Sequence, residues 1–141
     1  RDGTINKYVG FLRKEEEFEL LPEVSEAVKK INKSGYLAVV VTNQPVIARG
    51  EVTFEGLETI HNKMETLLGK EGAYLDGMLL KAAEDLNIDL SQSYMVGDGE
   101  NDIKAGKAAR CKTVLLNTEC DYYGQDICVA SLKDFVDQYL R

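Results

Sequence analysis

The sequence lacks a long apolar run, and it is short of positive charge. No apolar run in the 141-residue sequence approaches the ~20 residues that a membrane helix needs, and no signal peptide is recognisable. There are 17 Lys and Arg against 24 Asp and Glu, a net charge of -7. This balance argues against a nucleic-acid surface, because few phosphates would be neutralised. A small anionic substrate stays possible if a metal ion supplies local positive charge.

Cysteine is also scarce and is not paired in a recognisable way. Cys111, Cys120 and Cys128 lack the C-x-x-C spacing of zinc sites. Because an odd number argues against a disulfide framework, we expect free thiols at core or surface positions and a reducing, cytoplasmic location.

Apolar periodicity predicts helices that alternate with short apolar strands. Such alternation is typical of an α/β fold, a Rossmann-like three-layer sandwich with a mainly parallel sheet. The length predicts one domain over residues 1–141. We expect helices at 24–31, 54–69, 78–86, 101–109 and 132–139, and strands at 37–41, 94–97, 113–116 and 127–129.

Several residues predict where helices begin and end. Pro22 suits the first turn of the first helix, and Thr53 and Ser131 suit the N-caps of later ones. Gly35 suits the position just after the first helix. Apolar residues from Phe54 to Leu67 and from Leu132 to Tyr139 should face inward, and the acidic segment 14–17 should be an exposed loop.

Two places do not fit this pattern. A domain of this class should begin with a buried strand, yet Asp2 is almost the first residue. Residues 74–77 begin like a strand, but Met78 is expected to open the next helix at once, which leaves too little chain for a return to parallel register. We therefore expect that a first strand and a loop near 77–78 are missing.

Three short motifs place polar groups where an apolar run stops. The carboxyl ends of parallel strands meet at one edge of a sheet, so we expect Asp2, Thr42 and Asp98 to converge there. Carboxylates and a threonine at such an edge suit a divalent cation and a phosphate. The motifs are residues 1–4, 42–44 and 97–102.

At these residues the chain resembles the haloacid dehalogenase superfamily of phosphotransferases, and within it the histidinol-phosphate and heptose-bisphosphate phosphatase group. Residues 1–4 match the last four positions of the D-x-D-G-T motif, Thr42 matches the second motif, and residues 97–102 match G-D-x-x-x-D. The string T-N-Q…A-R-G over residues 42–50 is similar to the heptose-bisphosphate branch. The likeness covers residues 1–116 and implies little or no cap domain.

The resemblance implies roles in a reaction that passes through an aspartyl-phosphate. Asp2 would be the general acid and base, and the Thr42 hydroxyl and the Asn43 amide would hold phosphoryl oxygens. Asp98 would bind Mg²⁺ together with the Asp2 carbonyl. Asp102 would reach the same ion or hold Asp98 in place.

Three further residues would shape substrate binding. Gly3 permits the turn after Asp2, and Gln44 and Arg49 would orient the substrate. The planar fork of Arg49 suits a second phosphate. His61 is expected to be a histidine at the edge of the core rather than a ligand.

The resemblance also implies groups that this sequence does not contain. The nucleophilic Asp would directly precede Arg1, and the Lys of the third motif, K-P-x-P-G-M, would precede Met78. The branch often carries a Cys/His zinc loop, so zinc is possible only if a missing loop supplies those ligands. The chain without these groups would not perform the family's chemistry.

The leading hypothesis is a Mg²⁺-dependent phosphatase of carbohydrate metabolism, a phosphoric monoester hydrolase acting on a small sugar phosphate. Heptose 1,7-bisphosphate is the first candidate for the substrate, and histidinol phosphate is the second. A receiver-like domain is the alternative from another class, but it would need an acceptor Asp where this chain has Thr42. A catalytically inactive binding domain is the third. We expect a phosphorylated metabolite as partner, no nucleic acid and no membrane. The sequence does not determine the oligomeric state, and a monomer is favoured.

Overall fold

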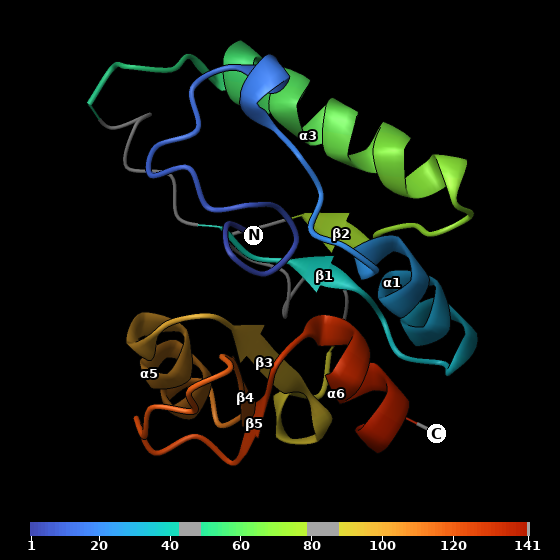
Figure 1. Cartoon of the computed structure of the whole chain (residues 1–141), viewed down its shortest axis with the longest axis vertical. Coiled ribbons are helices and arrows are strands. Elements are labelled where there is room, and N and C mark those ends of the chain that lie inside the picture. The colour runs from blue at the N-terminus through green and yellow to red at the C-terminus, as the bar shows by residue number, and fades with distance from the viewer. Residues whose placement is uncertain (43–48, 79–87, 141) are drawn as a thin grey trace. The chain divides into compact units, whose positions relative to one another are not determined.

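The structure is a computed structural model that describes residues 1–42, 49–78 and 88–140 (Figure 1). The chain divides into two compact units, Arg1–Leu80 and Lys81–Arg141. Every pair of named strands within the described ranges is parallel, which confirms the predicted α/β class with a parallel sheet. Across those ranges no helix combines the length and the apolar character needed to cross a bilayer. Apart from Met78, the helix predicted at 78–86 lies outside the described residues.

The first unit pairs two very short strands beside two helices. Strand β1 runs parallel to β2, with Val39 opposite Gly77 and Val40 opposite Met78. Buried apolar residues recur along both helices at the spacing of one helical face. The elements are the 3-10 turn η1 (Glu15–Glu17), α1 (Val24–Lys33), β1 (Val39–Val40), α3 (Phe54–Lys70) and β2 (Gly77–Met78).

Helix ends follow local chemistry in the first unit. The Thr53 hydroxyl accepts from the backbone N–H of Gly56 at 3.0 Å, which confirms the predicted N-cap of α3. Gly35 follows α1 with φ +81°, a left-handed conformation that glycine adopts without strain. Pro22 lies before the helix rather than in its first turn, because Glu23 has φ +60° and α1 begins only after it.

Three sequence predictions for this unit are wrong. The strand at 37–41 is shorter, since only Val39–Val40 pairs, and Leu37 is 51% exposed. Met78 lies in β2 and not in a helix, because its backbone pairs with Val40. Phe54 is 79% exposed instead of facing inward, because it is the first residue of α3, directly after an exposed cap.

The second unit is a three-stranded parallel sheet in the order β3-β4-β5 with helices packed on it. Gly106 allows α5 to approach the sheet closely: a Cβ there would lie 2.7 Å from side-chain atoms of Met95 and Thr113. The core includes Ile103, Val114, Leu115, Phe135 and Val136. The elements are η2 (Leu90–Gln92), β3 (Tyr94–Gly97), α5 (Glu100–Ala108), β4 (Lys112–Leu116), β5 (Ile127–Val129) and α6 (Leu132–Tyr139).

Helix α6 closes the second unit as predicted, with one exception. Its N-cap is Ser131, whose hydroxyl accepts from the backbone N–H of Asp134 at 3.1 Å. Tyr139 was predicted to face inward, yet it is 46% exposed. Its ring stacks on Phe135 at a centroid distance of 5.7 Å, so it covers the core from outside.

An aspartate fixes the start of one strand pair in each unit, an arrangement we call the aspartate clasp. Asp76, directly before β2, donates its backbone N–H to the Ala38 carbonyl at 2.8 Å and accepts the Ala38 N–H on Oδ2 at 2.8 Å. Asp126, directly before β5, donates to the Thr113 carbonyl at 3.1 Å. Its Oδ2 accepts from both the backbone N–H and the hydroxyl of Thr113, each at 2.8 Å.

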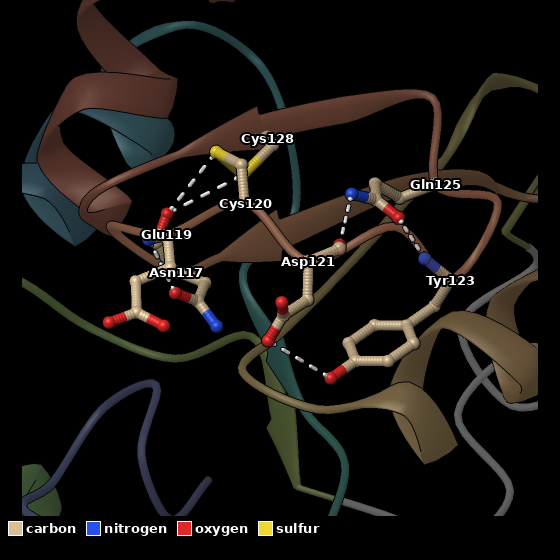
Figure 2. The surroundings of a disulfide bond; sticks show 7 residues. All are labelled: Asn117, Glu119, Cys120, Asp121, Tyr123, Gln125 and Cys128. Carbon is tan, nitrogen blue, oxygen red and sulfur yellow. Dashed lines mark hydrogen bonds between the residues drawn. A yellow bond between two sulfur atoms is a disulfide. The ribbon is translucent and has the colours of Figure 1, made fainter.

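A disulfide joins Cys120 to Cys128, so the prediction of three free thiols is wrong for two of them (Figure 2). Only Cys111 is a free thiol within the described residues. The segment between the bonded cysteines turns back on itself, because Gln125 donates to the Asp121 carbonyl at 2.8 Å. An odd count of cysteines does not exclude one bonded pair with a cysteine left over.

Candidate active site

The turn that follows Arg1 lies beside the end of β1. The backbone nitrogen of Arg1 donates to the Val41 carbonyl at 3.3 Å. Asp2 and Thr42 are the next residues along the chain after this hydrogen-bonded pair. Gly3 has φ +74°, and this turn therefore depends on glycine. Thr42 is half-buried. The first unit thus brings two of the predicted site residues to one place.

The Asp2 carboxylate is half-buried and is held by hydrogen bonds. Arg1 Nη2 donates to both of its oxygens at 3.1 Å, and Asn6 Nδ2 donates to Oδ1 at 3.0 Å. The Arg1 side chain is itself completely buried, and its Nη1 lies 3.2 Å from Nε2 of His61. Sequence reasoning missed Arg1 and Asn6 because only their neighbour Asp2 carries a recognisable motif role.

His61 is half-buried on α3, as expected for the edge of the core. Burial lowers the pKa of its imidazole, and the positive charge of Arg1 lowers it further. A neutral ring can accept a hydrogen bond from the guanidinium. No sequence signal pointed to this contact, which joins residues sixty positions apart.

Arg49 lies in an exposed cluster with Phe11, Arg13 and Glu51. Its guanidinium stands 4.9 Å from the Phe11 ring centroid, and that of Arg13 stands 5.6 Å from the same centroid. Glu51 pairs closely with Arg13, at 2.8 Å from Nε, and only loosely with Arg49, at 3.9 Å. Two of the other predicted phosphate and substrate contacts lie outside the described residues: Asn43 and Gln44.

In the second unit, Asp98 and Asp102 flank the turn between β3 and α5. Asp98 is exposed and directly follows Gly97, the last residue of β3. The Asp102 carboxylate folds back over this turn and accepts the Gly99 N–H at 3.1 Å. A Cβ at Gly97 would lie only 2.3 Å from that carboxylate, so the packing requires glycine there.

The donor set of this turn fits Mg²⁺, which takes few protein carboxylates and completes its shell with water and phosphate. Within the described part of the chain, no group of three His, Cys, Asp or Glu side chains could hold a metal without other ligands. Asp2 belongs to the first unit, whereas Asp98 and Asp102 belong to the second. Their convergence and their roles stay predictions.

Comparison with known proteins identifies the family. The sequence model of the haloacid dehalogenase-like hydrolases matches residues 2–110, and the chain belongs to this family. A relative from Salmonella typhi, named D-glycero-beta-D-manno-heptose-1,7-bisphosphate 7-phosphatase, is 35% identical over 82% of this chain and 76% of its own length. The resemblance seen in the three motifs is therefore confirmed.

Solved structures confirm the Rossmann-like α/β fold. The D,D-heptose 1,7-bisphosphate phosphatase from Burkholderia Thailandensis is 28% identical, with a TM-score of 0.81 over 99% of this chain and 94% of that one. The enzyme from B. bronchiseptica, complexed with magnesium and phosphate, is 23% identical with a TM-score of 0.86 over 98% of this chain and 93% of that one. At this identity the second likeness concerns the fold alone.

The alignment with the Salmonella typhi relative also contains gaps in this chain. It extends over 143 positions yet covers only 82% of these 141 residues. The relative therefore has residues that have no counterpart in this chain. Whether they fall near 77–78 stays a prediction.

Proposed function

We propose that this protein is a Mg²⁺-dependent phosphatase whose substrate is D-glycero-D-manno-heptose 1,7-bisphosphate. The observation that carries the proposal is the 35% identity, over most of both chains, to a relative of that name. The described residues support it, since Asp2 and Thr42 follow hydrogen-bonded neighbours and Asp98 directly follows a strand of a parallel sheet. A sugar with two phosphate monoesters carries several negative charges and does not cross membranes readily, so we place the reaction in the cytoplasm.

In the proposed reaction Asp2 moves protons and Thr42 binds the phosphoryl group. Asp2 gives a proton to the leaving alkoxide and then takes one from the water that attacks the aspartyl-phosphate. Hydrogen bonds from Arg1 and Asn6 hold its carboxylate in one orientation. The Thr42 hydroxyl donates to a phosphoryl oxygen whose charge grows in the transition state.

Asp98 and Asp102 would hold Mg²⁺ through carboxylate oxygens. When bound, the ion would offset the negative charge of the phosphoryl group. Asp102 is fixed by the Gly99 N–H and by its packing on Gly97, and this rigidity would place its second oxygen reproducibly.

Arg49 is proposed to bind the second phosphate of the substrate. Glu51 is already close to Arg13, at 2.8 Å, and is only 3.9 Å from Arg49 at its nearest. Because Arg13 neutralises that carboxylate, the planar fork of Arg49 keeps its donors for an incoming phosphate. The Phe11 ring would hold the guanidinium from one side.

The test measures phosphate release from heptose 1,7-bisphosphate. It compares the 141-residue chain with an extended chain that carries the strand and nucleophilic Asp before Arg1 and the Lys loop before Met78. We expect turnover only by the extended chain, and we expect Asp98→Asn to reduce it by about 100-fold or more. Glu100→Gln is the matched control, since Glu100 is an exposed acid of the same turn that pairs with Lys104.

Each other result has a definite meaning. Comparable turnover by the short chain would show that the nucleophile lies among its own residues, and the roles assigned to Asp2 and Thr42 would be wrong. Faster turnover of histidinol phosphate than of heptose 1,7-bisphosphate would show that histidinol phosphate is the substrate. No turnover of either ester by the extended chain would favour the inactive binding domain.

A further inference from the structure

The buried Arg1 side chain connects the acid–base residue to helix α3. Its guanidinium has no exposed surface, and burying such a charge is costly unless hydrogen bonds compensate it. One end donates to the Asp2 carboxylate at 3.1 Å, and the other lies 3.2 Å from His61 Nε2. The guanidinium therefore has defined contacts on both sides.

His61 offers this guanidinium a fixed acceptor. Its neighbour Ile60 and Met64, one turn later, are both completely buried, so the helix around His61 is anchored in the core. Arginine only donates, so Nε2 must be the unprotonated nitrogen and the ring proton must be on Nδ1. The lowered pKa of His61, caused first by burial and then by Arg1, agrees with a neutral ring.

Asp2 has a second support that does not depend on His61. Asn6 is completely buried and donates to Asp2 Oδ1 at 3.0 Å and to the Lys7 carbonyl at 2.9 Å. Arg1 and Asn6 thus both donate to the Asp2 carboxylate. Loss of the His61 contact would remove one of the contacts that orient the Arg1 guanidinium and would leave the Asn6 hydrogen bond in place.

We propose that His61 is a positioning residue for proton transfer: through Arg1 it fixes the direction in which the Asp2 carboxylate points. The inference rests on the proposed function, because it takes Asp2 as the general acid. His61 itself does not touch the substrate. Its contribution is to keep the acid within reach of the leaving oxygen.

The contact can be tested on the 141-residue chain without any turnover. The sequence contains one histidine, so a two-dimensional ¹⁵N–¹H spectrum of the imidazole shows a single ring. We expect the neutral Nδ1–H tautomer at pH 7, and we expect it to persist in an Asn6→Ala variant. A proton on Nε2 would remove the acceptor and overturn the proposal.

The functional consequence is tested with two esters and the same extended chain. Glycerol phosphate has an alkoxide leaving group that needs a proton, whereas the phenolate of nitrophenyl phosphate leaves without one. The quantity compared is kcat/KM, which reports steps up to leaving-group departure. We expect His61→Ala to lower it by about 10- to 100-fold for glycerol phosphate and much less for nitrophenyl phosphate.

His61→Gln is the matched variant, because its side-chain carbonyl can still accept from Arg1. We expect it to restore most of the activity on glycerol phosphate. Equal losses on the two esters, or a Gln variant as damaged as the Ala variant, would show a merely structural histidine. Absence of phosphate release from heptose 1,7-bisphosphate by the unsubstituted extended chain would instead refute the proposed function.

Discussion

The bond between Cys120 and Cys128 allows a stability measurement on the second unit whose size can be worked out in advance. The bonded cysteines are 8 positions apart in the sequence. For a loop of roughly that length, the chain-entropy expression gives about 8 cal/mol/K, or about 2.5 kcal/mol at 25 °C. We therefore expect reduction, or Cys120→Ser, to lower the free energy of unfolding of this unit by about that amount.

The assay is urea unfolding with and without a thiol reductant, after a count of thiols by alkylation and mass spectrometry. We expect one alkylated cysteine, Cys111, in the native protein and three after reduction and unfolding. Cys111→Ser is the control, since this cysteine is not bonded and its loss should leave the effect of the reductant unchanged. Three alkylated cysteines in the native protein, or equal stability with and without reductant, would refute the reasoning.

Three further outcomes are expected. Gly106→Ala should destabilise the protein by about 1–3 kcal/mol, because its Cβ would lie 2.7 Å from Thr113 Cγ2, whereas Gly69→Ala has open space and should not destabilise; urea unfolding compares them. Thr53→Ala should cost about 1 kcal/mol through loss of the α3 N-cap, and an unchanged midpoint would contradict the cap. The pKa of Asp126 lies below its ordinary value of 3.8, because the Thr113 amide and hydroxyl donate to it. The contribution of the ionised Asp126 to the free energy of unfolding is therefore complete above pH 3.8 and is lost as the pH falls through the folded pKa. The Asp126→Asn variant should lack this pH-dependent loss, which acid unfolding of the two proteins measures.

Local chemistry was the part of the fold that sequence reading predicted well. The Thr53 and Ser131 caps and the glycine after α1 depend on groups within a few residues of each other. The strands at 94–97 and 127–129 have the predicted bounds, because each is a compact apolar run next to turn residues. Such signals do not depend on how distant segments pack.

Contacts between distant segments were the part that sequence reading missed. Met78 begins an apolar run that suits a helix, but pairing with Val40 places it in a strand. The approach of Cys120 to Cys128 depends on the fold of the loop between them, which carries no turn signature strong enough to predict it. Spacing cannot reveal pairs of this kind.

The candidate site divides in the same way. The motifs named Asp2, Thr42 and Asp98 from sequence alone, since Asp2 precedes a glycine turn and the other two follow apolar runs. The surroundings of Asp2 required the structure, because Arg1 meets His61 only when α3 lies beside the first turn. The family match supports the motif assignment and leaves the role of each residue to experiment.

The aspartate clasps have a consequence for how the chain can change in length. Ala38 and Asp76 are 38 positions apart, and Thr113 and Asp126 are 13 positions apart. Each pair nevertheless forms the same backbone contacts at the start of two parallel strands. Alignment of each pair is thus specified by two residues that meet directly and not by the length of chain between them. Segments can be inserted into or removed from those connections over evolutionary time while the strands keep the same partners, provided that the aspartate at the entrance is retained.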